Sequence, residues 1–362
     1  MSRSSSYYLD KLKNDIKTEA TRLGFSHIGF TKPSTPNHAD IFIEWLENGY
    51  AGTMNYLNRP DTLEKRLDPR KILASCESII ILTLPYTPAS IQEEAINPKI
   101  ASYAIGQDYH KVIPDLLEHL ISRIKTELDP EILEYGIYTD SGPILERELA
   151  SRAGLGWIGK NSCLINPTTG SFFFLAEILV NLPFEPDDPF DQDFCGTCNR
   201  CVENCPTGCI LPNRTIDSNR CISFLTIENK ADIPEELRPL LNGWVFGCDI
   251  CQQVCPWNIR FSEKPFPNYF QSSKEVENFN IRDLLTIDQD KFKDYFAESP
   301  ISRAKLYGLK RNLLAFAAYH FSDDLIDPIK HLIRNENNGE LKKLAFWVFQ
   351  KNDQEMEDFS IT

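Results

Sequence analysis

Eight of the nine cysteines between residues 195 and 255 constrain this chain more than any other feature of its sequence. The first four are Cys195, Cys198, Cys201 and Cys205, in the pattern C-x2-C-x2-C-x3-C-P. In two-cluster iron–sulfur domains, this spacing places three thiolates on one [4Fe–4S] cluster and directs the fourth to the other cluster. A structural zinc site is the alternative, but such sites normally use two C-x2-C pairs. The pattern therefore predicts a bacterial-ferredoxin-like domain with two [4Fe–4S] clusters.

A second and less regular set supplies the remaining ligands: Cys221, Cys248, Cys251 and Cys255, the last followed by proline. Because the final cysteine of each run serves the other cluster in two-cluster ferredoxins, we expect the two sets to cross. The predicted ligands of cluster 1 are Cys195, Cys198, Cys201 and Cys255, and those of cluster 2 are Cys205, Cys221, Cys248 and Cys251. Each cluster then has four cysteine ligands, which favours electron transfer over substrate binding at an open iron.

The N-terminal residues and the lengths of the apolar runs predict that this protein lies in a reducing compartment. Residues 1–8 lack the apolar stretch of a secretory signal, and no run approaches the roughly 20 apolar residues that span a bilayer. We therefore expect a cytoplasmic, monomeric protein without membrane contact, in which clustered cysteines hold metal rather than form disulfides. Cys76, Cys163 and Cys209 have no ligand role in this assignment and are predicted to be small buried side chains.

Composition and periodicity divide the chain into three parts. Residues 1–189 alternate apolar strands (27–30, 77–84 and 172–182) with helices such as 111–127, which predicts an α/β domain. Residues 190–262 are rich in Cys, Pro and Gly and depend on their metal for a core. Residues 263–362 are helical, and apolar faces at 329–333 and 341–348 predict a HEAT-like segment. The predicted fold is therefore a multidomain protein of mixed α/β and α+β class.

Charge gives a weaker indication about partners. The formal net charge is −14, which by itself argues against nucleic acid, since phosphate binding needs a positive surface. Basic residues nevertheless gather in two places in the sequence: Lys65, Arg66, Arg70 and Lys71, and Arg303, Lys305, Lys310 and Arg311.

Residues 138–161 are the densest candidate for chemistry in the first part. Ser141-Gly-Pro143 is typical of a helix start, so a structural reading makes Asp140 a carboxylate that caps helix amides. The glycines at 154, 156 and 159 would allow close approach of something planar or bulky. His110 follows Asp108 in a D-x-H pattern seen in some cobalamin proteins, but Ile113 replaces the required glycine. We therefore expect His110 to be an ordinary polar contact and not a cobalt ligand.

Four segments together resemble the epoxyqueuosine reductase family: YTDSGPILERELASRAGLGWIGKN at 138–161, ASYAIGQDYHKV at 101–112, RCISFLTIE around Cys221 and GCDICQQVCPWN around Cys248. The resemblance extends over essentially the whole chain. It implies an oxidoreductase that reduces the epoxide of epoxyqueuosine in a tRNA anticodon loop to queuosine, the last step of queuosine biosynthesis. It also implies cobalamin and two [4Fe–4S] clusters as cofactors, tRNA as a partner and an external low-potential electron donor.

The resemblance also implies roles for single residues. Asp140 corresponds to the family's general acid, with a pKa that burial against the corrin should raise. The implied cobalamin contacts are Arg66, Asp140, Leu164, Leu175, Ser223, Asp249 and Ile250. The cobalt carries no protein histidine in this family, in agreement with the failed D-x-H pattern. Lys310 and Arg311, in the second basic group, are the candidates for contact with tRNA phosphates.

Two other classes of protein share parts of this sequence pattern. An electron-transfer polyferredoxin subunit would have the clusters without a corrinoid, but it leaves the large first part of the chain unexplained. A cobalamin-dependent reductive dehalogenase would share the cofactors but not the substrate. Such enzymes typically carry a twin-arginine export signal, which residues 1–8 do not show.

Overall fold

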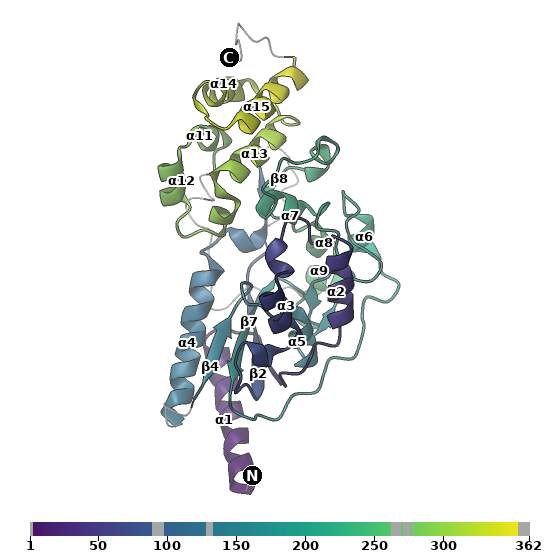
Figure 1. Cartoon of the computed structure of the whole chain (residues 1–362), viewed down its shortest axis with the longest axis vertical. Helices are drawn as coiled ribbons and strands as arrows, with labels where there is room; N and C mark the ends of the chain where they lie inside the picture. Colours follow the sequence, from purple (N-terminus) through teal and green to yellow (C-terminus); the bar gives the residue numbers. More distant parts are fainter. Residues whose placement is uncertain are drawn as a thin grey trace.

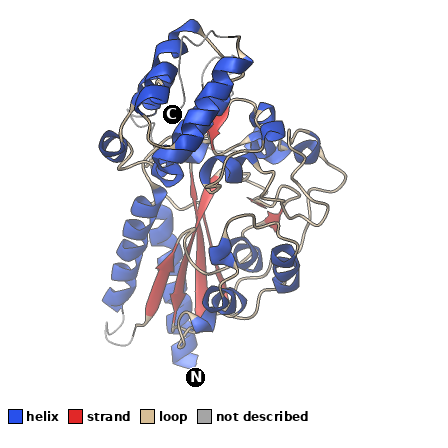
Figure 2. Ribbon diagram, turned by 45° about the horizontal axis from the view of Figure 1, so that its top comes forward, coloured by secondary structure: helices blue, strands red, loops and turns tan. Residues whose placement is uncertain are grey.

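A four-stranded sheet lies at the centre of the computed structural model, which describes residues 3–88, 98–127, 133–261, 269–270, 276 and 279–353 (Figures 1 and 2). The strand order is β1 (His27–Thr31), β2 (Ser78–Pro85), β7 (Phe173–Val180) and β4 (Tyr135–Tyr138). The predicted apolar strands are confirmed. All three pairings are antiparallel, so this part is α+β and the α/β prediction is wrong. The helical connection that follows β1 leads into β2, which lies beside β1 and runs in the opposite direction.

Helices cover both faces of this sheet. On one face, α1 (Arg3–Arg22) and α4 (Tyr109–Glu127) pack against the side chains of Phe174, Ala176, Ile178 and Val180. On the other face, α5 (Glu146–Arg152) packs against the alternate residues Phe173 and Leu179. Strands buried on both faces read as continuous apolar runs, which explains the sequence pattern of β2 and β7. Helices α2 (Ala39–Glu47) and α3 (Pro60–Leu67) lie on the α5 side (Figure 1).

The loop between β4 and α5 differs from the predicted helix start at Ser141. Helix α5 begins at Glu146, its N-cap position is Leu145, and no side chain caps it. Asp140 has a φ of +56°, in the left-handed region, so this residue lies outside any right-handed helix. The Thr139 hydroxyl donates a hydrogen bond to the Leu175 carbonyl at 2.8 Å and ties the loop to β7. The structural reading of Asp140 as a helix cap is therefore wrong.

The glycines after α5 serve chain packing and not a planar ligand. Strands β5 (Trp157–Ile158) and β6 (Leu164–Ile165) form a small antiparallel hairpin. A Cβ on Gly156 would lie 2.1 Å from the Ile165 carbonyl oxygen, and one on Gly154 would lie 2.6 Å from the Asp188 carbonyl oxygen. Both residues have positive φ angles. Only glycine allows the chain to approach itself this closely, so the expectation of a ligand at these positions is corrected.

The cysteine-rich part consists of short helices joined by turns: α6 (Arg200–Glu203), α7 (Ile222–Ile227), α8 (Ile250–Gln253) and α9 (Pro256–Phe261). Strand β8 (Trp244–Phe246) pairs in parallel with β3 (Lys99–Ile100) and so ties this part to the first one. The Phe30 amide donates to the Asp187 carboxylate at 3.0 Å, close to the expected boundary at 189. The expected boundary at 262 lies outside the described residues.

The C-terminal part is helical, as predicted. Its helices are α11 (Ile281–Thr286), α12 (Gln289–Tyr295), α13 (Lys305–Ala317), α14 (Ile326–Asn335) and α15 (Gly339–Lys351). The predicted apolar faces of α14 and α15 are buried in a core that also includes Val245 and Phe246. No helix in the described ranges is long and apolar enough to cross a lipid bilayer.

Candidate cluster-binding and active site

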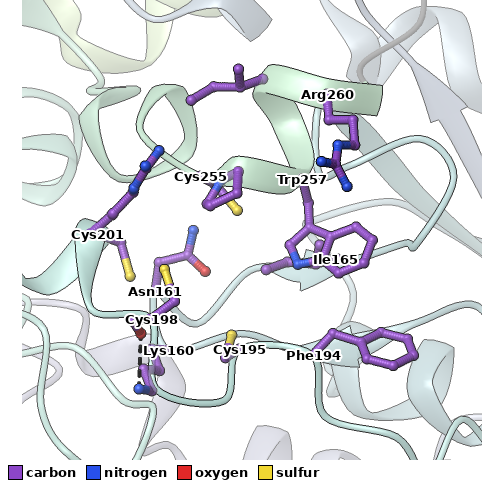
Figure 3. A pocket seen from close by; sticks show the side chains of 13 residues that line it. Lys160, Asn161, Ile165, Phe194, Cys195, Cys198, Cys201, Cys255, Trp257 and Arg260 are labelled. Carbon is purple, nitrogen blue, oxygen red and sulfur yellow. Dashed lines mark hydrogen bonds between the residues drawn. The ribbon is translucent and has the colours of Figure 1, made fainter.

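Four of the predicted ligands line one cavity of about 360 Å³ (Figure 3): Cys195, Cys198, Cys201 and Cys255. Trp257, Phe194 and Ile165 form its apolar wall. The Lys160 ammonium donates to the Gly196 and Cys198 carbonyls, each at 2.9 Å, and holds the first cysteine turn in place. The structure thus brings Cys255 to three cysteines that lie more than 50 residues earlier, the crossed grouping that the spacing predicts.

The other four predicted ligands also face one another. The Cys248 thiol lies within electrostatic range of Cys221 and Cys205, and Cys251 of Cys248 and Cys221. Two further thiols lie against this group. The Cys209 sulfur is 3.4 Å from the Cys205 sulfur, and Cys163 is within hydrogen-bonding range of Cys251. Cys209 is buried, as predicted, but its position beside a candidate ligand was not predicted.

The arrangement of the first group of thiols suits a cluster. These four cysteines surround a cavity. A four-iron cluster requires this arrangement, because each corner iron takes its own thiolate.

A separate polar network surrounds Asp140. Its carboxylate oxygen Oδ2 lies 2.9 Å from Arg303 Nη1 and 3.1 Å from His110 Nε2. The other ring nitrogen of His110 lies 2.7 Å from the Asp108 carboxylate, and the Tyr109 hydroxyl also hydrogen-bonds to Asp140. Arg303 comes from a short 3-10 helix, η6 (Pro300–Ala304), before α13. Three distant segments therefore meet at this carboxylate.

The pKa of Asp140 is lowered, although it was expected to be raised. The Asp140 side chain is 45% exposed, yet Arg303, His110 and Tyr109 crowd its carboxylate. Burial would raise its pKa, but the His110 and Tyr109 hydrogen bonds and the Arg303 charge lower it to about 2. Burial would lower the pKa of His110, but its two carboxylate partners raise it. In this arrangement the proton of the network is therefore carried by His110, and Asp140 is ionised.

His110 and Arg303 are the functional candidates that reasoning from sequence missed. His110 was expected to be an ordinary polar contact; the Asp108-x-His110 spacing, which sets one ring nitrogen against a carboxylate, was the available signal. Arg303 was noted only as part of a basic group. No local signal connects Arg303 to Asp140, because 163 residues separate them.

Two of the implied cobalamin contacts, Arg66 and Asp249, share neighbours with Asp140. Tyr56 is within electrostatic range of Arg66, Asp140 and Arg303, and Tyr103 is within range of Asp140 and Asp249. Arg66 is buried, and the hydrogen bond from its guanidinium to the Thr62 carbonyl is a long 3.5 Å.

The remaining implied contacts come from four elements. Asp249 accepts hydrogen bonds from the Ser102 amide and hydroxyl at 2.7 and 2.6 Å. Leu175 lies on β7 and Leu164 on β6, while Ser223 and Ile250 belong to α7 and α8 beside the second cysteine group. The chemistry of this set, which is an arginine, apolar side chains and two carboxylates, suits a corrin with amide side chains.

Lys310 and Arg311, which were predicted to contact tRNA phosphates, do not lie on the surface. Both are buried, with 6% and 1% exposed surface. Lys310 forms an ion pair with Glu336 at 3.2 Å. Arg311 donates to the carbonyls of Leu225 at 2.6 Å, Asn229 at 2.7 Å and also Ala231. The reason is that α13 is the central helix of the C-terminal core, so its basic side chains serve internal carbonyls and not a nucleic-acid surface.

Two groups of cysteines arranged for clusters, together with a separate polar network around Asp140, define a class: an iron–sulfur oxidoreductase. Two family models match, "4Fe-4S double cluster binding domain" at residues 194–258 and "Epoxyqueuosine reductase QueG, DUF1730" at residues 66–141. The chain is 40% identical over 307 residues to an epoxyqueuosine reductase of Cyclobacterium marinum, covering 84% of this chain and 96% of the relative. The chain belongs to the epoxyqueuosine reductase family.

Other relatives agree with this assignment. The Escherichia coli epoxyqueuosine reductase is 38% identical over 300 residues, with 82% of this chain and 78% of the relative covered. A crystal structure of an epoxyqueuosine reductase with an epoxyqueuosine-modified tRNA-Tyr stem loop superposes with a TM-score of 0.86 and 29% identity. That match covers 95% of this chain and 90% of the other.

Proposed function

We propose that this chain reduces the epoxide of epoxyqueuosine in tRNA to the alkene of queuosine, with cobalamin and two [4Fe–4S] clusters as cofactors. The observation that carries the proposal is the network around Asp140, which brings a carboxylate, an imidazole and a guanidinium into direct contact. The family membership supports the same reaction. A relative in this family has been solved with an epoxyqueuosine-modified stem loop, which supports tRNA as the substrate.

The cysteines would hold the electron carriers. We assign cluster 1 to Cys195, Cys198, Cys201 and Cys255, and cluster 2 to Cys205, Cys221, Cys248 and Cys251. The shared cavity supports the first set and the mutual proximity of the thiols supports the second. An external low-potential donor would reload the clusters, and the chain would act as a monomer.

Cobalamin, when bound, would supply two-electron reducing power at the epoxide carbon. Arg66, Asp249, Leu164, Leu175, Ser223 and Ile250 would hold it, together with Asp140. Asp140 would deliver a proton to the departing epoxide oxygen. General acid catalysis of this kind contributes roughly 10²–10⁴-fold in rate.

Because the pKa of Asp140 is lowered, the proposed mechanism needs an additional proton transfer. Asp140 is ionised while it contacts Arg303 and His110, so it must take up a proton before it can give one. His110 lies 3.1 Å away with a raised pKa and can supply that proton, while Asp108 holds the imidazole in place. Asp140 and His110 would therefore act as one acid, with Asp140 nearer the substrate.

The proposed function is tested by measuring the conversion of epoxyqueuosine to queuosine directly. The protein is purified without oxygen, its clusters are reconstituted, and cobalamin is added. It is then reduced and mixed with an anticodon stem loop that contains epoxyqueuosine. Mass spectrometry of the digested RNA should show queuosine only when cobalamin, reductant and protein are all present. Clusters without cobalamin binding or conversion would instead indicate an electron-transfer subunit.

A further inference from the structure

Two glutamates, one buried and one half-buried, lie behind the Asp140 loop and have no role in the chemistry proposed above. Glu177 lies in the middle of β7, opposite Ile81 of β2 and Tyr138 of β4, and none of its surface is exposed. Glu146 is the half-buried first residue of α5. Both lie on the α5 side of the sheet, among the apolar residues that pack there.

The side chain that faces the Glu177 carboxyl is the carboxyl of Glu146, at hydrogen-bonding range. Among the described residues, neither oxygen of Glu177 meets a hydrogen-bond donor while both glutamates are ionised. Two ionised carboxylates have only acceptors, so they can bond to each other only if one of them carries a proton. A buried charge pair of like sign would also be costly. A buried carboxyl without a donor, next to a second carboxyl, therefore favours a proton shared between Glu177 and Glu146.

The pair is connected to Asp140. The Asp140 amide donates to Glu146 Oε1 at 2.5 Å, which holds the Glu146 carboxyl directly under the loop. Other charged groups that face Glu146 are the Asp140 carboxylate, Arg147 and Arg66. Burial, and then the Asp140 charge, raise the pKa of Glu146 to about 7; burial and then Glu146 raise that of Glu177 well above its ordinary value.

We propose that Glu146 and Glu177 form a proton store that reloads Asp140 during reduction of the epoxide. This inference rests on the proposed function. Conversion of an epoxide to an alkene breaks two C–O bonds, forms one C=C bond and consumes two electrons and two protons, and the oxygen leaves as water. The clusters and their external donor supply the electrons. His110 can pass one proton to Asp140, and the glutamate pair supplies the second, from Glu177 to Glu146 and then to the Asp140 carboxylate, which lies within electrostatic range of Glu146.

Infrared spectroscopy tests the shared proton without any substrate. A protonated carboxyl has a C=O stretch that is separate from the carboxylate bands and shifts to lower frequency in D2O. The wild-type holoprotein at neutral pH should show this band, and Glu177→Gln should lack it. Glu146→Gln is the second variant and should lack it too. Glu148→Gln is the matched control, because Glu148 is buried on the same helix but faces Arg152 at 3.3 Å, and it should keep the band.

Single-turnover kinetics tests the use of that proton. Because the donor must be protonated, the wild-type rate should fall as the pH rises through about 7. Glu177→Gln should slow turnover by about tenfold or more and lose this pH dependence, with iron and cobalamin content unchanged. The proposal would be overturned if the infrared band persisted in both Glu177→Gln and Glu146→Gln. It would also be overturned if the band were lost while the turnover rate and its pH profile stayed as in the wild type. A wild type that cannot convert epoxyqueuosine would instead overturn the proposed function, while the infrared result would still report on the pair.

Discussion

The guanidinium of Arg303 lies 2.9 Å from the carboxylate of Asp140 and joins the C-terminal helical part to the loop after β4. The contact spans 163 residues of sequence. It stabilises the ionised form of the carboxylate, which is the form that cannot act as an acid. Binding of RNA phosphates near Arg303 would compete with Asp140 for the same guanidinium.

The first prediction concerns this ion pair. In Arg303→Gln, the positive charge that lowers the pKa of Asp140 is lost, while burial, which raises it, remains. The pKa of Asp140 should therefore rise, and the pH above which single-turnover reduction slows should move upward. Lys111→Gln is the control, because Lys111 forms an exposed ion pair with Glu298 at 2.8 Å and does not touch Asp140. Identical pH profiles for Arg303→Gln and wild type would contradict the prediction.

The second prediction concerns Asp140 itself. Asp140→Asn keeps the shape of the side chain but cannot deliver a proton, so it should abolish conversion of epoxyqueuosine. Iron content and cobalamin absorbance should be unchanged, and the melting temperature should fall only by what the ion pair with Arg303 and the contact with His110 contribute. An Asp140→Asn variant that turns over at the wild-type rate would exclude Asp140 as the proton donor.

The third prediction concerns the crossed ligand sets. The protein should bind about eight irons, four in each cluster. Cys205→Ser should disrupt the cluster that Cys248 also holds and leave the Cys195 cluster intact, as measured by iron analysis and EPR. Cys209→Ala is the matched control: it removes a thiol 3.4 Å from Cys205 that is not a predicted ligand, so both clusters should remain. Loss of the Cys195 cluster in Cys205→Ser would refute the crossing.

The fourth prediction concerns Arg311. Its guanidinium donates to three carbonyls, two of them in buried hydrogen bonds, so Arg311→Ala leaves these acceptors without a donor. The expected loss is about 3–5 kcal/mol of unfolding free energy, visible as a large drop in melting temperature. Lys343→Ala, which removes an exposed ion pair on α15, should change stability by less than about 1 kcal/mol. A stable Arg311→Ala variant with weakened tRNA binding would restore Arg311 as a surface contact.

Some features of the molecule follow from local sequence. The apolar runs that form β2 and β7 have no polar face, and strands covered by helices on both sides need none. The cysteine spacing predicts which thiols belong together because a cluster imposes its own geometry on the chain. The apolar faces of α14 and α15 follow from helical periodicity alone.

Other features required knowledge of the fold. Ser141-Gly-Pro143 has the composition of a helix start, yet α5 begins five residues after Ser141 because Asp140 takes a left-handed conformation next to β7. Lys310 and Arg311 have the composition of a nucleic-acid surface, yet α13 lies inside the C-terminal core.

Residue type and spacing thus establish the cofactor class, the strands and the helices of this protein, because these depend on interactions between near neighbours or on a cluster that dictates its ligand positions. The protonation of Asp140, Glu146 and Glu177 depends on contacts between residues far apart in the chain. Arg303 keeps Asp140 ionised and Glu146 meets Glu177 only because the packing of the sheet, α5 and the C-terminal helices brings them together. A pKa is set by burial and by the charges that surround a group in space, and no local pattern in the sequence records either of them.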